Sequence, residues 1–249
     1  MKIPFFATML AMGLAITCNA ATLQFDFGQP NSQSENHHQA PGNYNHVFAV
    51  GQVLTPSDAI DITGASTGIG LTITGVNGNP AFNHVGPNFD GTVAPTGAAA
   101  IFHPNATRDS LFGHSDNFNA GSPRPEATLT FTGLDGSGAT VYDFTFFASR
   151  MGVGDVRDTE YSVAGANSGV AILNASNNTS NVAIVSDIAP TASGEIVITV
   201  SAPLTNTNGS KFFYLGALQM ESSAVIPEPT TACLALISMT VMIGSRRRK

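Results

Sequence analysis

The sequence predicts an all-β protein built as an antiparallel β-sandwich, with a jelly roll as the specific version. Short runs of β-branched and aromatic residues recur along the middle of the chain, and turns rich in Gly, Asn, Ser and Pro separate them. Outside the two ends of the chain, no stretch shows the apolar stripe of an amphipathic helix. We therefore expect a sandwich over residues 21–223, flanked by an apolar helix at each end.

The expected strands follow one another as short alternating or apolar runs. Residues 71–76 and 127–132 alternate threonine with apolar side chains, which predicts one wet and one buried face. Residues 195–200 are more continuously apolar, as in a central strand. Turn sequences such as 135–138 and 206–209 separate the runs. In chain order, the expected strands are 22–27, 47–54, 59–63, 70–76, 127–132, 140–149, 160–164, 170–173, 181–188, 195–200 and 212–220.

The segment 77–126 is less regular than the rest. It is rich in proline and carries His84, His103 and His114. We expect long loops and short strands there, at one end of the sandwich. Loops of this length often carry function.

The N-terminus has the composition of a secretory signal peptide over residues 1–20. Lys2 is followed by an apolar run from Ile3 to Ile16 and by small residues that suit cleavage after Ala20. A lipoprotein signal acylated at Cys18 is the alternative. Since Cys18 lies in the signal and the other cysteine in the C-terminal tail, the exported domain has no disulfide and must fold by packing.

The tail, residues 224–249, combines three features in a fixed order. Pro227, Glu228 and Pro229 come first, an apolar run from 230 to 244 follows, and the chain ends on four cations. An apolar run with terminal cations suits a membrane-spanning helix whose cations stay on the cytoplasmic face. The alternative is a buried C-terminal helix of a soluble domain. The four terminal cations are Arg246, Arg247, Arg248 and Lys249.

This order resembles the PEP-CTERM sorting signal of exported bacterial proteins. The resemblance implies recognition of the tail by exosortase, a membrane transpeptidase-like enzyme, and a link to exopolysaccharide or biofilm production. It implies export through the general secretory route, a membrane-associated stage, and final placement at the cell surface or outside the cell. It implies nothing about the activity of residues 21–223.

Acidic side chains dominate the predicted exported domain. The whole chain has a net charge of −7, although four of its cations stand together at the C-terminus. An acidic surface repels phosphates, so we expect no nucleic-acid partner. The basic residues of the domain are Arg108, Arg124, Arg150, Arg157 and Lys211.

The segment 150–161 concentrates two arginines with three carboxylates. Guanidinium groups bind carboxylates or sugar hydroxyls with fixed geometry, so Arg150, Arg157 and Glu160 are candidate ligand-binding residues. The alternative is a salt-bridged loop that closes a hairpin between the strands on either side.

Tyrosine rings supply a second set of candidates, because aromatic faces stack on the apolar faces of sugars. Tyr44 and Tyr161 are candidates for this role, whereas Tyr142 and Tyr214 lie in apolar strands and are expected in the core. The chain has no tryptophan, which weakens the case for sugar binding.

A further resemblance concerns the fold. Residues 142–150, 155–163 and 213–218 resemble galactose-binding-like carbohydrate modules of secreted bacterial proteins. The resemblance implies a β-sandwich, and no ligand or site is carried over from it.

Other chemistries find weaker support. Residues 61–70 resemble the nucleotide loop of short-chain dehydrogenases, but the next residues alternate like a strand instead of opening a helix, so a hairpin turn is expected. Metal binding by His37, His38 and His46 is weighed against an exposed polar loop. No cofactor is expected, although calcium could bind acidic loops, and the metal question stays open. The acidic candidates are Asp109, Asp116 and Asp155.

The sequence thus predicts a non-enzymatic, surface-sorted β-sandwich of the cell envelope or the exopolysaccharide matrix. It has no expected catalytic residue. The partners expected are an exosortase-type enzyme, the membrane through the C-terminal helix, and a polysaccharide. A carbohydrate-binding module is the first alternative, and a secreted glycoside hydrolase is the second.

Overall fold

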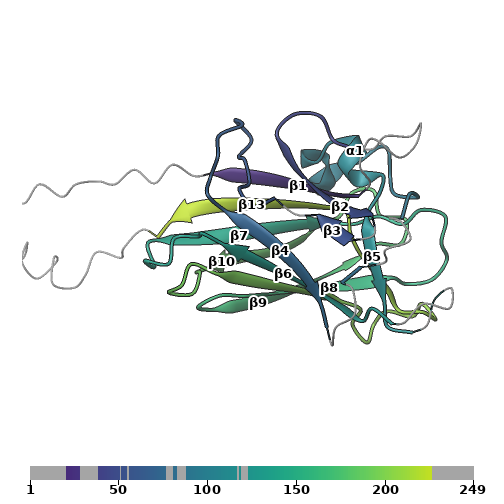
Figure 1. The fold of residues 1–249 in the computed structure, drawn as a ribbon. Coiled ribbons are helices and arrows are strands. Elements are labelled where there is room, and N and C mark those ends of the chain that lie inside the picture. Colours follow the sequence, from purple (N-terminus) through teal and green to yellow (C-terminus); the bar gives the residue numbers. More distant parts are fainter. Residues whose placement is uncertain are drawn as a thin grey trace, which may run out of the picture.

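Two β-sheets face each other across an apolar core in the computed structural model (Figure 1). The structure describes residues 21–28, 39–50, 52–54, 56–76, 81–82, 88–116, 118 and 123–225. The described residues confirm an all-β sandwich, while the jelly-roll version stays a prediction. The six-stranded sheet has the order β10 (Ala183–Ile188), β7 (Thr140–Phe147), β13 (Ala217–Ala224), β1 (Thr22–Gly28), β2 (Tyr44–Val50), β3 (Gln52–Leu54). The five-stranded sheet has the order β4 (Gly70–Gly75), β6 (Glu126–Thr132), β11 (Ile196–Ser201), β8 (Asp158–Ala164), β9 (Ser168–Asn174).

Strand pairing is antiparallel almost throughout. The first and last described strands are neighbours, with Thr22 opposite Glu221 and Asp26 opposite Ala217. The exception is the parallel pair β1 and β2, in which Asp26 stands opposite His46. Strand β11 is the middle strand of its sheet, as its apolar run predicts.

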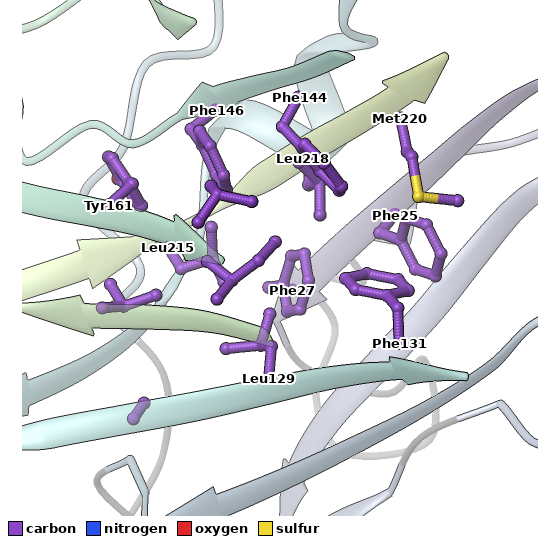
Figure 2. Packing of buried hydrophobic residues seen from close by; sticks show 14 of the residues in the cluster. Phe25, Phe27, Leu129, Phe131, Phe144, Phe146, Tyr161, Leu215, Leu218 and Met220 are labelled. Atoms are coloured by element: carbon purple, nitrogen blue, oxygen red, sulfur yellow. The ribbon is translucent and has the colours of Figure 1, made fainter. Parts of the chain in front are cut away.

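The core lies between the sheets and is rich in phenylalanine. Strands β6 and β8 alternate half-buried and buried residues, which places every second side chain inside. The rings of Phe146 and Tyr161 stack with centroids 4.3 Å apart, and Phe25 meets Phe131 edge to face (Figure 2). Burial of these rings from both sheets is the main force that holds the sandwich closed.

A second apolar cluster covers the outer face of the six-stranded sheet. The 3₁₀ helix η1 (Gly97–Ile101) and the helix α1 (Pro104–Thr107) supply Phe102 and Ala106, which pack with Phe147 and Ala217. His103 caps α1, since its Nδ1 accepts a hydrogen bond from the Asn105 amide at 3.1 Å. Therefore β7 and β13 are buried on both faces near this cluster.

Several expected element boundaries are wrong. The expected strand 47–54 is divided between two paired strands, β2 and β3, and 212–220 is divided by Gly216 into β12 (Phe212–Leu215) and β13. Residues 59–63 form a turn closed by an antiparallel bridge between Ile60 and Ser66, so the glycine-rich motif is a turn before β4, as expected. The short strand β5 (Leu111–His114) and the two short helices in the proline-rich segment were not predicted individually.

The segment 148–157 is a crossover and not the hairpin of the alternative interpretation, although Arg157 does form an ion pair with Asp155 within it. Strand β7 belongs to the six-stranded sheet and β8 to the five-stranded sheet, so this segment carries the chain from one sheet to the other. The hairpin prediction fails because strands adjacent in sequence need not pair when a sandwich offers two sheets.

The predicted signal peptide, and the predicted sorting tail from residue 226 onward, fall on parts of the chain that the structure does not describe. Within the described ranges, no helix is long and apolar enough to cross a membrane. The predicted membrane helix, the residues from Pro227 to Pro229 and the four terminal cations lie outside those ranges.

Candidate functional site

A two-stranded ribbon at one end of the sandwich forms the base of the candidate site. Strands β5 and β12 pair antiparallel, with Phe112 opposite Tyr214 and His114 opposite Phe212. Because side chains alternate along each strand, these four rings share the outer face. The inner face presents Phe213, Leu111 and Leu215 to the core.

Gly113 permits this ribbon to lie flat on the core. A Cβ atom at that position would stand 2.1 Å from the Phe213 Cζ atom, so no other residue fits without moving a fully buried ring. The glycine therefore holds β5 and β12 in the register that sets the outer rings.

A pocket of about 400 Å³ opens beside the ribbon, and we call it the aromatic pocket. Its aromatic lining comes from three separate segments of the chain and consists of Phe89, Phe112, Phe118, Phe212 and Tyr214. Its polar lining consists of Asn88, Asp90, Arg150 and Arg157. Apolar rings beside a few hydrogen-bonding groups are typical of small-molecule sites.

Phe89 stands at this pocket with 47% of its surface exposed. Its neighbours in the chain are fastened to the scaffold. The Asn88 amide donates to the Ser110 carbonyl at 2.8 Å, and the Met151 amide donates to the Asp90 carbonyl at 2.6 Å. The backbone therefore fixes an exposed ring at the pocket, which lowers the entropy cost of using it to bind.

The Arg157 guanidinium lies beside the ribbon and donates hydrogen bonds to two side chains, Asp155 and Tyr214. Its Nε donates to Asp155 Oδ1 at 2.9 Å, its Nη1 donates to the Tyr214 hydroxyl at 2.6 Å, and its Cζ lies 5.4 Å from the centre of the Phe212 ring. The hydrogen bond from Arg157 lowers the pKa of Asp155. Burial raises the pKa of Tyr214 despite the nearby guanidinium, so the phenol stays protonated at neutral pH.

Arg150 and Asp90 form a second ion pair in the lining. Arg150 Nη1 contacts Asp90 Oδ2 and also donates to the Met151 carbonyl at 3.1 Å. The pair is open to water, with the Asp90 side chain 61% exposed. It links the loop that carries Phe89 to the crossover after β7.

Two side chains of β8 fix the ribbon from beneath. The Tyr161 hydroxyl donates to the Tyr214 carbonyl at 2.7 Å, and the Tyr214 amide donates to Thr159 Oγ1 at 2.9 Å. These contacts occupy both backbone groups of Tyr214. Strand β8 therefore positions the residue whose hydroxyl faces Arg157.

The five predicted ligand-binding residues separate into two groups. Arg150 and Arg157 line the same pocket, and their role in binding stays a prediction. Tyr161 is fully buried in the core, which corrects its prediction as a sugar-stacking ring. Glu160, its neighbour on β8, is half-buried and outside the pocket lining. Tyr44 lies on the other side of the six-stranded sheet, where its hydroxyl accepts from the His103 amide at 3.0 Å.

Sequence reasoning missed most of the pocket. Tyr214 was assigned to the core, and it is indeed buried, yet it also lines the pocket. Phe89 carried a usable signal, since it stands in the turn sequence Asn-Phe-Asp-Gly, where a buried strand residue is not expected. No local signal marks Phe112 or Phe212, because their shared face depends on a pairing between distant segments.

The candidate metal ligands do not gather. In the part of the chain that the structure describes, no group of three His, Cys, Asp or Glu side chains is arranged to hold an ion. Asp155 is engaged by Arg157, and His46 Nδ1 lies 3.2 Å from Asp26 Oδ2. His37 and His38 lie outside the described ranges, and calcium binding stays an untested prediction.

The aromatic pocket lies opposite the two ends of the described domain. The Ala21 amide donates to Ser222 Oγ at 2.9 Å, so the start of β1 and the end of β13 are side by side. At the other end of β13, Ala217 pairs with Phe147 of β7. Arg150 of the pocket lining follows Phe147 by three residues. In Figure 1, β13 ends on the left, whereas β5 lies toward the right.

Comparison with known proteins gives little beyond these observations. No protein-family model and no curated protein matches the chain. Among solved structures, the chain is similar to TmCBM61, a carbohydrate-binding module in complex with β-1,4-galactotriose. The similarity has a TM-score of 0.29 and 12% sequence identity, and it covers 62% of this chain and 88% of that one. Overlap at this level carries no argument about the ligand. Any argument about the ligand must therefore rest on the residues of the aromatic pocket.

Proposed function

We propose that this protein is an exported, non-enzymatic β-sandwich that binds carbohydrate in the aromatic pocket and is sorted to the cell surface or extracellular matrix. The observation that carries the binding proposal is the half-exposed Phe89 ring, held on a fastened backbone beside the Tyr214 hydroxyl and two guanidinium groups. Sugars present both an apolar C–H face and hydroxyl groups. A pocket that combines aromatic faces with hydrogen-bond donors suits that chemistry.

The carboxylates near the pocket favour binding over glycoside hydrolysis. A hydrolase needs one carboxyl group with a raised pKa to act as the general acid. Hydrogen bonding lowers the pKa of Asp155, and Asp90 is in contact with Arg150. Both groups thus neutralise arginines, and neither is arranged as a proton donor to a leaving group.

A polysaccharide pull-down with the full-length protein in detergent tests the binding proposal. Saturable binding to at least one polysaccharide is expected, and Phe89→Ala should weaken it about tenfold or more, equivalent to at least ~1.4 kcal/mol. Ile62→Ala is the matched control, because Ile62 is 51% exposed and belongs to the turn that touches Thr22 at the opposite end. Equal binding by the two variants would remove Phe89 from the site.

The sorting proposal rests on the sequence of the tail and needs its own experiment. We expect Glu228→Ala, or deletion of residues 246–249, to leave the protein in the cell membrane with an unprocessed tail. Fractionation of cells followed by immunoblotting measures both the location and the tail length. Unchanged surface delivery and processing of both variants would contradict recognition of this tail.

A further inference from the structure

We infer that the aromatic pocket selects uncharged glycans over acidic ones, because each of its guanidinium groups is already neutralised by a carboxylate. The inference rests on the proposed carbohydrate-binding function and specifies the class of glycan. Two arginines in a pocket would ordinarily suggest a ligand with carboxylate groups. The contacts of these two arginines point the other way.

Arg157 is committed to Asp155. Two of its nitrogens reach the two carboxylate oxygens, Nε to Oδ1 at 2.9 Å and Nη2 to Oδ2 at 3.4 Å. Asn208 Nδ2 also donates to Oδ2, which fixes the carboxylate from its other side. A carboxylate ligand would have to displace Asp155 from a fork that already fits it.

Arg150 is paired with Asp90 through a single contact, from Nη1 to Oδ2. The next cation along the chain, Lys211, directs its Nζ to the Asn206 carbonyl. Asp155 binds Arg157 from outside the pocket lining, and once it is counted the charges of the two ion pairs sum to zero. An acidic sugar in the pocket would meet the Asp90 carboxylate in its lining, and like charges at close range disfavour its binding.

The groups left to bind a ligand are neutral or already balanced. Among the described residues, the Tyr214 hydroxyl accepts from Arg157 and its own proton remains to donate. Phe89, Phe112 and Phe212 add aromatic rings to the pocket lining. A neutral sugar can use these groups without separating either ion pair.

The test compares matched oligosaccharides that differ at C6 alone, where a hydroxymethyl group is replaced by a carboxylate. The probes are β-linked gluco-, galacto- and manno-oligosaccharides with their glucurono-, galacturono- and mannurono- counterparts, titrated against the full-length protein by calorimetry. We expect at least one neutral member to bind about tenfold or more tightly than its acidic counterpart. Asp90→Asn should raise the acidic-to-neutral affinity ratio about tenfold, and added salt should reduce that gain.

Asp187→Asn provides the control for the charge change. Asp187 is exposed, lies on β10 next to the residue that pairs with Tyr142, and adopts a φ of 60° that asparagine tolerates. It should leave the ratio unchanged. Asp90 is well exposed, so a thermal melt should show that Asp90→Asn folds.

The outcomes separate the inference from the function on which it rests. Tighter binding of acidic members by the unaltered protein, or an unchanged ratio in folded Asp90→Asn, would overturn the neutral-glycan inference and leave carbohydrate binding standing. Failure of the folded protein to bind any oligosaccharide or polysaccharide would overturn the proposed function, and the inference with it.

Discussion

Arg157 Nη1 donates a hydrogen bond to the Tyr214 hydroxyl over 2.6 Å, between a side chain of the crossover and one of the β12 ribbon. The same guanidinium binds Asp155. The carboxylate therefore fixes the position of the Arg157 side chain, and Arg157 in turn orients the Tyr214 phenol. The phenol oxygen therefore acts as the acceptor in this chain of contacts. Its own proton is therefore not used in this contact and can be donated to another acceptor, such as a ligand in the pocket that Tyr214 lines.

Tyr214→Phe tests this relationship with the removal of one oxygen atom. We expect affinity for a bound neutral oligosaccharide to fall about tenfold, because a donor to the sugar is lost and an Arg157 N–H loses its acceptor. Calorimetric titration measures the change. Tyr142→Phe removes the same atom near the opposite end of the sandwich and should bind normally. Equal affinities would show that the Tyr214 hydroxyl makes no contribution to binding.

Tyr161→Phe should destabilise the fold, although the change is small in volume. Tyr161 is fully buried and its hydroxyl donates to the Tyr214 carbonyl at 2.7 Å, so the variant leaves a buried carbonyl without that donor. The expected loss in the free energy of unfolding is about 1–3 kcal/mol. Urea denaturation measures it. The half-buried Tyr44 offers the comparison Tyr44→Phe, which should lose less, and a larger loss there would contradict this explanation.

The Asp155 carboxylate should stabilise the protein at neutral pH and lose this effect in acid. Hydrogen bonding from Arg157 lowers the pKa of Asp155 in the folded protein. A carboxylate with a lowered folded pKa stabilises the fold above its ordinary pKa of about 3.9, and the effect is lost as pH falls through the folded value. The difference in unfolding free energy between the unaltered protein and Asp155→Asn should therefore shrink on acidification. A difference that stays constant down to pH 2 would contradict this.

Asp26 should show the opposite dependence. It is buried between β1 and the cluster of η1 and α1, and burial raises its pKa even though Oδ2 accepts from the Ala40 amide at 2.8 Å. A raised folded pKa gives a contribution that is present below about pH 3.9 and lost as pH rises through the folded value. The Asp26→Asn variant cannot lose this contribution. Its free energy of unfolding should therefore rise relative to that of the unaltered protein as pH increases. Denaturation curves from pH 3 to 8 measure the difference, and parallel stability profiles would refute it.

The strand pattern was largely predictable because it depends on local alternation. Threonines alternating with apolar residues in β6 predict one buried face, and Ala127, Leu129 and Phe131 are buried there. Boundaries failed where the chain turns without a strong turn sequence. Gly216 ends β12 inside an apolar run, and the distribution of strands between two sheets left no local trace in residues 148–157.

The site was predictable only through its charged residues. Two arginines in one short segment were visible in the sequence, and both line the pocket. Their aromatic partners come from 88–118 and 212–214 and meet them only after the sheets assemble. Tyr161 was misjudged although the alternation of β8 marks its face, because Asp158, Glu160 and Ser162 occupy one side of the strand and leave Tyr161 on the buried side with Thr159 and Val163.

The hydrogen bond between Ala21 and Ser222 places both ends of the described domain at one end of the sandwich. A leader joined before Ala21 and a tail joined after Val225 would leave from one end, while the aromatic pocket opens at the other. The eight residues of β13 separate those ends by about 27 Å. If the tail holds the protein at the membrane, as we propose, the pocket would face away from the membrane, so the proposed carbohydrate binding would not require release of the tail.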